Sequence, residues 1–173
     1  MAKQSAYKFS ACARRYLVEA GWKTDRAVSV SIYLDAYARE GLALSSAARM
    51  FLRSFGGLLM RYKSTSGQED TLGFMADEAV RNMGGGILAQ TEEQFGVGSL
   101  CPIGHYLWGM CLLLQAEDGS VYGLMDDRRV LIGKSGEESV DNVLSLEEPQ
   151  VLESEYLSDL RNVAVHLRKK KKG

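Results

Sequence analysis

The sequence predicts an α+β fold in one domain, with N-terminal helices packed on a mainly antiparallel sheet and an additional C-terminal helix. Apolar residues recur at helical spacing in the first third of the chain, short apolar stretches separated by turns fill residues 100–132, and helical spacing returns from residue 137. The 173 residues are enough for one domain whose core needs no metal or disulfide. A hydrophobic share of 46% and a charged share of 25% exclude disordered and coiled-coil chains.

The first third of the chain contains three expected helices. Phe9–Ala20 places apolar residues at spacings of three and four, and Gly21 is a suitable end for this helix. Ser31 and Ser45 are suitable N-caps for two further helices, because a serine hydroxyl accepts a hydrogen bond from the first helical turn. In chain order, the expected elements are helix 9–20, a short strand over 28–30, helix 32–40 and helix 46–55.

Residues 58–132 are expected to supply the sheet. The segment Glu117–Ser120 contains Asp-Gly, which is typical of a tight hairpin turn. A polar loop is expected over 63–71, and a region of mixed helical character over 74–95 is interrupted at Gly84–Gly86. Its clearer helix is expected over 87–95, and the expected strands are 58–62, 100–103, 108–115, 121–125 and 129–132.

Two helices are expected after the sheet. The first spans 137–144, and the second is an amphipathic helix over 151–167. Acidic residues lie near the start of the second helix and Arg168–Lys172 at its end, an order that suits the helix dipole. Such a helix packs on its own domain or pairs with a second copy, so a homodimer through this helix is one expectation.

Charges of opposite sign are segregated along the chain, although the formal net charge is only −1. Residues 1–63 carry +7 and residues 156–173 carry +5, whereas residues 64–116 carry −5 and residues 117–155 carry −8. A large acidic surface repels nucleic acid and attracts basic partners, so no direct nucleic-acid binding is predicted. The alternative is a solvated surface with balanced charge. The four terminal lysines are expected to form a solvated tail.

The sequence predicts neither membrane insertion nor secretion. The longest apolar run, Leu107–Leu114, is far shorter than the ~20 residues that span a bilayer, and the first residues lack the apolar core of a signal peptide. Cys12, Cys101 and Cys111 are three widely separated cysteines, which favours free thiols over a disulfide framework. We therefore expect a cytoplasmic protein.

Several short motifs occur in a characteristic order along the chain. They are Ala20-Gly21-Trp22, Ala47–Leu52, Phe55–Leu58, the apolar run Trp108–Leu114, Glu117–Gly123, Asp126-Asp127 and Ile132–Ser135. In this order, over about residues 9–145, the chain resembles the SUKH superfamily and, within it, the third SUKH family of bacterial immunity proteins. The run Gly84–Gly86 and the residues from Ser145 onward depart from the family pattern.

The resemblance implies a SUKH-like immunity domain over 1–150, followed by a C-terminal amphipathic helix and basic tail over 151–173. It implies a non-enzymatic protein that binds a cognate bacterial toxin domain and neutralises it by occlusion. The resemblance also implies the kind of toxin, since the partners of this superfamily are typically nuclease or nucleic-acid deaminase domains of polymorphic toxin systems. The acidic segment is compatible with that implication, because an inhibitor of a basic active-site cleft needs acidic groups at the interface. The alternative is a regulatory scaffold that docks cellular partners without inhibiting any toxin.

The expected contacts with the partner are acidic side chains and two aromatic anchors. Tyr106 and Trp108 lie next to a glycine-containing turn, and aromatic side chains often anchor protein interfaces. The acidic groups come from three places, which are the predicted hairpin turn, a further turn or exposed strand end and the start of the helix over 137–144. The expected partner-binding residues are Tyr106, Trp108, Glu117, Asp118, Asp126, Asp127, Glu137, Glu138 and Asp141.

No catalytic residue, cofactor or metal site is predicted. Cys101, His105 and Cys111 provide too few ligands for a structural zinc ion, so the thiols are expected to be small core residues. Adjacent residues in a strand point to opposite faces, which disfavours Asp126 and Asp127 as a catalytic carboxylate pair. The sequence therefore favours a binding protein over an enzyme.

Overall fold

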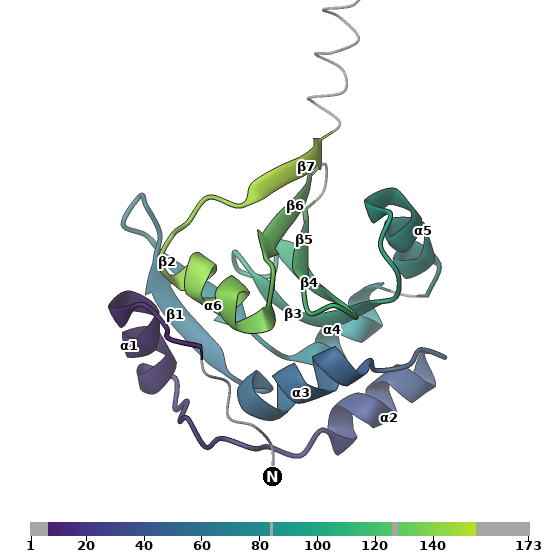
Figure 1. Ribbon diagram of the computed structural model, residues 1–173, viewed down its shortest axis with the longest axis horizontal. Helices are drawn as coiled ribbons and strands as arrows, with labels where there is room; N and C mark the ends of the chain where they lie inside the picture. The colour runs from purple at the N-terminus through teal and green to yellow at the C-terminus, as the bar shows by residue number, and fades with distance from the viewer. Residues whose placement is uncertain (1–6, 84, 126–127, 155–173) are drawn as a thin grey trace, which may run out of the picture.

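The computed structural model describes residues 7–83, 85–125 and 128–154, and this part of the chain forms six helices and seven strands. The helices are α1 (Ala11–Glu19), α2 (Ser31–Arg39), α3 (Ser46–Phe55), α4 (Ala76–Met83), α5 (Gly85–Phe95) and α6 (Gly136–Leu144). The strands are β1 (Leu59–Lys63), β2 (Glu69–Gly73), β3 (Leu100–Tyr106), β4 (Cys111–Ala116), β5 (Val121–Met125), β6 (Arg128–Gly133) and β7 (Gln150–Ser154). The strands form one antiparallel sheet in chain order, which confirms the predicted α+β class (Figure 1).

Serine side chains cap two of the N-terminal helices. Ser10 Oγ accepts a hydrogen bond from the Ala13 N–H at 3.1 Å and begins α1. Ser45 Oγ accepts from the Ala48 N–H at 3.1 Å, so the predicted cap of α3 is confirmed. Both hydroxyls satisfy a backbone donor that has no partner within the helix.

The strand predicted over 28–30 is wrong. These residues connect α1 to α2 without strand structure, and the Val28 N–H donates to the Arg53 carbonyl at 2.9 Å, which holds the connection against α3. Ser31 is the first residue of α2, and the N-cap is Val30, which has no side-chain hydrogen bond. The β-branched valines predict extended backbone, but no neighbouring strand is available for them to pair with.

The polar loop predicted over 63–71 is correct only in its first half. Residues 69–73 form β2, which pairs with β1 in a hairpin so that Tyr62 lies opposite Asp70. Glu69, Asp70 and Thr71 are polar, and the run they form lacks the alternation that predicts a strand. Pairing with β1 therefore overrides the local signal.

Strands β3 to β6 form a meander. The Asp-Gly turn between β4 and β5 is confirmed, because Gly119 has a φ of 93° and the Ala116 N–H donates to the Ser120 carbonyl at 2.9 Å. Trp108, expected at the start of a strand, lies instead in the turn between β3 and β4, and β4 begins at Cys111.

The helix predicted from Val151 is wrong for its first residues. Residues 150–154 form β7, an edge strand in which Val151 lies opposite Val130 of β6. Pro149 precedes β7, and its fixed φ suits an extended chain at this point. The rest of the predicted helix, its proposed pairing with a second copy and the lysine tail lie outside the described residues.

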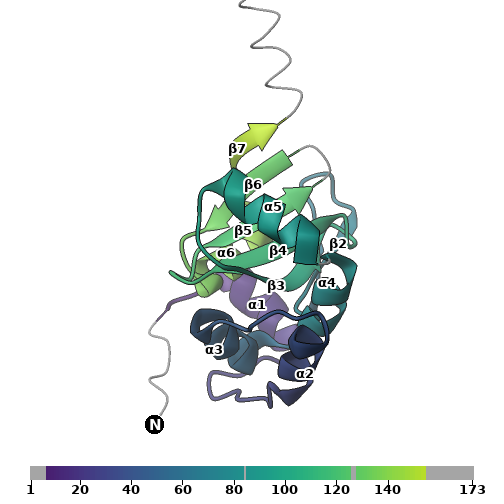
Figure 2. The same ribbon diagram turned by 90° about the vertical axis from the view of Figure 1, so that its right-hand side faces the viewer.

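Helices cover both faces of the sheet (Figures 1 and 2). Side chains alternate between the faces along β4. Cys111 and Leu113 belong to the main core, which also contains buried residues of α1, α2, α3 and α6, whereas Leu114 packs in a second cluster with Leu88 of α5. No helix in the described ranges is long and apolar enough to cross a membrane.

Two of the three free cysteines are core residues, as predicted. Cys101 and Cys111 are fully buried, and burial raises the pKa of the Cys111 thiol to about 12. Cys12 is exposed, so the prediction that the thiols lie in the core is wrong for this residue.

Candidate functional site

The β3–β4 turn exposes two large apolar side chains. Leu107, Trp108 and Gly109 follow one another with left-handed φ values of 55°, 53° and 84°. A non-glycine residue in this conformation costs roughly 1–2 kcal/mol. Trp108 is 57% exposed and Met110 is 71% exposed. A strained turn that presents apolar side chains to solvent is typical of a binding site rather than of a stability element.

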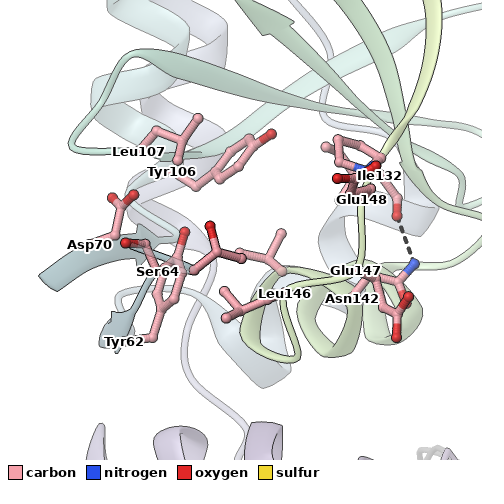
Figure 3. A pocket seen from close by; sticks show the side chains of 13 residues that line it. Tyr62, Ser64, Asp70, Tyr106, Leu107, Ile132, Asn142, Leu146, Glu147 and Glu148 are labelled. Carbon is pink, nitrogen blue, oxygen red and sulfur yellow. Dashed lines mark hydrogen bonds between the residues drawn. The ribbon is translucent and has the colours of Figure 1, made fainter. Parts of the chain in front are cut away.

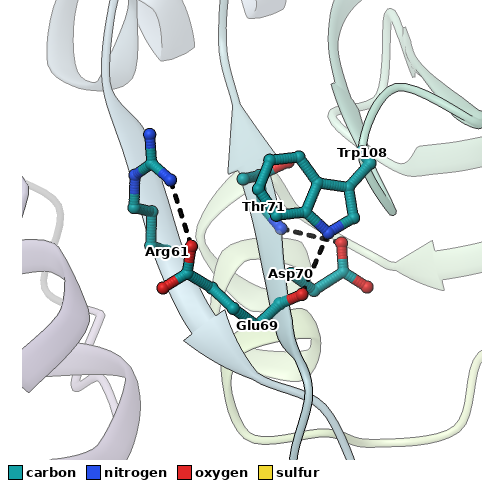
Figure 4. Close-up of polar contacts among 5 residues, drawn as sticks. All are labelled: Arg61, Glu69, Asp70, Thr71 and Trp108. Atoms are coloured by element: carbon teal, nitrogen blue, oxygen red, sulfur yellow. Dashed lines mark hydrogen bonds and ion pairs between the residues drawn. The ribbon is translucent and has the colours of Figure 1, made fainter.

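Trp108 is fixed in position despite its exposure. Its indole Nε1–H donates to the backbone carbonyl of Glu69 at 2.9 Å, which ties the turn to the start of β2 (Figure 4). The Glu69 carboxylate in turn accepts a hydrogen bond from the Arg61 guanidinium at 3.0 Å. A side chain that is already positioned loses little conformational freedom on binding, which suits an anchor residue.

Tyr106, the other predicted anchor, lines a pocket next to the same turn. Tyr106 is only 7% exposed and faces a pocket of ≈ 230 Å³ between the β1–β2 hairpin, the end of β3 and the connection from α6 to β7 (Figure 3). The lining residues are Tyr62, Ser64, Thr65, Asp70, Tyr106, Leu107, Ile132, Asn142, Val143, Leu146, Glu147, Glu148 and Pro149. The pocket therefore lies next to the turn that carries the exposed Trp108.

The pocket combines two aromatic rings with a buried carboxylate. Asp70 is 8% exposed, and its Oδ1 accepts a hydrogen bond from the Thr71 N–H at 2.7 Å (Figure 4). Burial raises the pKa of Tyr62 and of Tyr106, and the negative charge of Asp70 contributes to both shifts. Both phenols therefore remain neutral near pH 7.

Two further carboxylates lie at the rim of the pocket. Glu147 and Glu148 are exposed and belong to the connection from α6 to β7. Together with Tyr62 and Asp70, they are pocket residues absent from the contacts predicted from the sequence. Both glutamates lie in the strongly negative segment 117–155. The net charge of this segment is therefore the sequence signal that could have added them to the predicted contacts.

The predicted acidic contacts Glu117, Asp118, Glu137 and Glu138 lie at another place in the fold, where the β4–β5 turn meets the N-terminus of α6. Glu117 and Asp118 are exposed, and Asp118 Oδ1 accepts the Ser120 N–H at 2.9 Å. The Gln115 amide, next to this turn, donates to the Gly119 carbonyl at 3.1 Å. A Cβ on Gly136, the first residue of α6, would lie 3.2 Å from the same amide. The structure thus brings these four residues to one region.

Glu138 and Asp141 make hydrogen bonds within the chain. Ser135 Oγ caps α6 by accepting the Glu138 N–H at 3.1 Å, and Glu138 Oε2 accepts the N–H of Lys134, the residue before the cap, at 2.6 Å. Asp141 accepts hydrogen bonds from the Ser10 hydroxyl at 2.6 Å and from the Tyr7 hydroxyl at 3.1 Å. Both carboxylates therefore stabilise the fold, and Asp141 holds the N-terminal segment against α6.

Asp126 and Asp127 lie outside the described residues, so their predicted contact stays a prediction. Within the described ranges, no group of three histidine, cysteine, aspartate or glutamate side chains is placed to hold a metal ion. Cys101 and Cys111 lie in the core, and burial lowers the pKa of His105 on β3. The described residues therefore offer contact surfaces rather than a cluster of metal ligands.

A protein-family comparison identifies the chain. The model of the SUKH-3 immunity protein family matches residues 9–145. The match includes α1 to α6, β1 to β6 and the whole β3–β4 turn, and it ends in the connection that leads to β7. No curated protein and no solved structure matches the chain significantly. Because the family match covers most of the sequence and the same residues 9–145 over which the resemblance was predicted, the chain belongs to the SUKH-3 family of immunity proteins, which are not enzymes.

Proposed function

We propose that this protein binds a cognate bacterial toxin domain and neutralises it by covering the toxin's active site. The observation that carries this proposal is the family match over residues 9–145. Immunity by occlusion needs a rigid surface with anchor residues rather than a catalytic centre. The fixed and exposed Trp108 meets that requirement.

The proposed toxin is a nuclease or nucleic-acid deaminase domain of a polymorphic toxin system, acting in the cytoplasm of the cell that makes both proteins. Enzymes that act on nucleic acid carry basic clefts, since their substrates are polyanions. Residues 64–116 and 117–155 carry net charges of −5 and −8, which complement such a cleft.

The proposed contact surface surrounds the β3–β4 turn. Trp108 and Met110 provide apolar anchors, and the pocket of Tyr106 with the rim residues Glu147 and Glu148 provides negative charge. The predicted acidic residues at the β4–β5 turn and the start of α6 form a second candidate contact region. They are Glu117, Asp118, Glu137 and Glu138, followed along α6 by Asp141.

The partner is identified by capture with the tagged full-length protein from its own cells, followed by mass identification and an activity assay. The expected result is one large protein whose C-terminal toxin domain loses activity at a one-to-one ratio with this chain. Several unrelated cellular proteins without a toxin among them would contradict the proposal and favour a regulatory scaffold.

Charge reversal distinguishes the two contact regions once the toxin domain is available. The double substitution Glu147→Lys with Glu148→Lys is expected to slow association by about tenfold or more and to flatten its salt dependence, because exposed charges act mainly on encounter. The matched control replaces Glu117 and Asp118 by lysine. A larger decrease of the association rate in the control would assign the toxin contact to the β4–β5 turn instead.

A further inference from the structure

We propose that the pocket formed by Tyr62, Asp70 and Tyr106 is the receptor for one arginine side chain of the partner (Figure 3). The inference rests on the proposed function only for the identity of the partner as a toxin domain. The pocket itself supplies the features that recognise a guanidinium group.

The size of the pocket suits one side chain. Its volume of ≈ 230 Å³ is below the range of roughly 300–1,000 Å³ that is usual for small-molecule sites. Its walls are the rings of Tyr62 and Tyr106 with the apolar side chains of Leu107 and Leu146. Such walls can receive the methylene stem of an arginine, whose planar head packs well against aromatic rings.

The charge of the pocket selects a cation. Asp70, Glu147 and Glu148 contribute three carboxylates, and none of the described lining residues is a lysine, arginine or histidine. Asp70 forms no ion pair with any basic residue of the described ranges, and its Oδ2 makes no hydrogen bond there. The Asp70 carboxylate therefore remains available to a cation from outside the chain, and a charge-assisted hydrogen bond to a guanidinium is among the strongest contacts that it can make.

The hairpin geometry directs Asp70 into the pocket. Tyr62 of β1 and Asp70 of β2 are opposite partners in an antiparallel pair, so their side chains lie on the same face of the sheet. Leu72 of β2 pairs with Tyr106 of β3, which places the second ring on that face as well. The two rings and the carboxylate therefore come from three neighbouring strands whose register fixes their positions.

The test uses N-acetyl-L-arginine methylamide as the probe and the matching citrulline derivative as its neutral control. The ring resonances of Tyr62 and Tyr106 are followed by NMR in the full-length protein. The arginine probe is expected to shift both sets of resonances saturably, with a dissociation constant on the order of 1–10 mM for one side chain. Equal shifts with the citrulline derivative, or no saturable shift with arginine, would overturn the proposal.

Asp70→Asn tests the role of the carboxylate. The variant keeps an acceptor for the Thr71 N–H and is expected to bind the arginine probe at least tenfold more weakly. Its melting temperature is expected to stay close to that of the parent protein, because the Thr71 N–H keeps its acceptor. Unchanged probe binding, or a melting temperature lower by several degrees, would show that Asp70 has a structural role instead. Glu93→Gln on the exposed face of α5 is the matched control.

The chain's own lysine tail is a second possible occupant of the pocket. A full-length variant with Lys169–Lys172 replaced by glutamine tests this alternative. Unchanged tyrosine resonances in the free variant support a partner's arginine as the occupant. Altered resonances would instead assign the pocket to the chain's own tail and overturn the inference. These measurements need no toxin. A failure of the pocket assignment is therefore seen here, whereas a failure of the immunity function is seen only in the toxin assays.

Discussion

Trp108 is held at the surface by its backbone and by one hydrogen bond. The left-handed φ of 53° places the indole outside the core, and the bond to the Glu69 carbonyl fixes its direction. Trp108 is 57% exposed, so it contributes little to the hydrophobic core. A residue that is ordered and exposed in the free protein is therefore better explained by binding than by folding.

Trp108→Ala is expected to weaken toxin binding by about 2 kcal/mol or more, as for a buried aromatic anchor, with a melting temperature close to that of the parent protein. Binding is measured by calorimetry and stability by thermal unfolding. The control is Ile87→Ala on α5, a side chain of similar exposure at 55%. Loss of binding by the control alone would contradict the assignment of the anchor.

Asp141 illustrates the opposite case, a predicted contact with a structural role. Asp141→Asn is expected to destabilise the fold by about 1–2 kcal/mol, since the carboxylate accepts hydrogen bonds from Ser10 and Tyr7. Thermal unfolding measures the effect, with the exposed Asp35→Asn on α2 as the control. An equal stability of the two variants would contradict the structural role.

The same variant has a pH signature. Burial and the hydrogen bond to Asp141 raise the pKa of Tyr7 from 10.0 to about 12. A raised folded-state pKa of an acid stabilises the fold fully below pH 10, and this contribution is lost as the pH rises from 10 to about 12. Asp141→Asn is therefore expected to lower the pKa of Tyr7 and to shift the start of alkaline unfolding downward, which ultraviolet titration of tyrosine measures. An unchanged titration curve would exclude Asp141 as a cause.

The close pairing of β2 with β3 depends on Gly104. A Cβ on Gly104 would lie 2.1 Å from the Gly73 carbonyl oxygen, a backbone atom that cannot move away without breaking the sheet. The register of β3 against β4 also shifts between Pro102 and Gly104. This glycine therefore allows the close approach that aligns Tyr106 with the pocket.

Gly104→Ala is expected to destabilise the protein by about 3 kcal/mol or more, because the methyl group overlaps backbone. Urea unfolding measures the loss, and expression in the insoluble fraction is the extreme form of the same result. Gly98→Ala is the control, since a Cβ there meets nothing within 4 Å. Equal stability of the two variants would contradict the close packing of β2 and β3.

Most elements are predictable from the sequence where local periodicity and caps decide the structure. The apolar spacing of α1 and α3, the serine cap at Ser45 and the Asp-Gly turn all predict local structure correctly. The sequence does not predict β2 and β7 as strands, because each becomes a strand only by pairing with its neighbour in the sheet. These neighbours are β1 for β2 and β6 for β7. Local propensity does not report such pairing, which depends on the rest of the sheet.

The binding surface is less predictable because it forms from distant parts of the whole molecule. The sequence singles out Trp108 as an aromatic residue beside glycines, but it places this residue at the start of a strand, and only the structure shows that it lies exposed in the β3–β4 turn. Asp70 is not singled out by the sequence, because only the pairing of β1 with β2 turns it into the pocket beside Tyr62. The −8 segment predicts acidic contact, but the fold places its described carboxylates in different regions. Glu147 and Glu148 lie at the pocket rim, whereas Glu137 and Glu138 lie at the start of α6.

Co-expression in a heterologous bacterium tests whether this protein neutralises the toxin by direct binding. The toxin domain of the captured partner is expressed in a heterologous bacterium with and without this protein, and growth is measured. We predict that the toxin domain alone stops growth and that the full-length protein restores it through a one-to-one complex. Continued growth arrest, with both proteins soluble and at equal levels, would contradict neutralisation by direct binding.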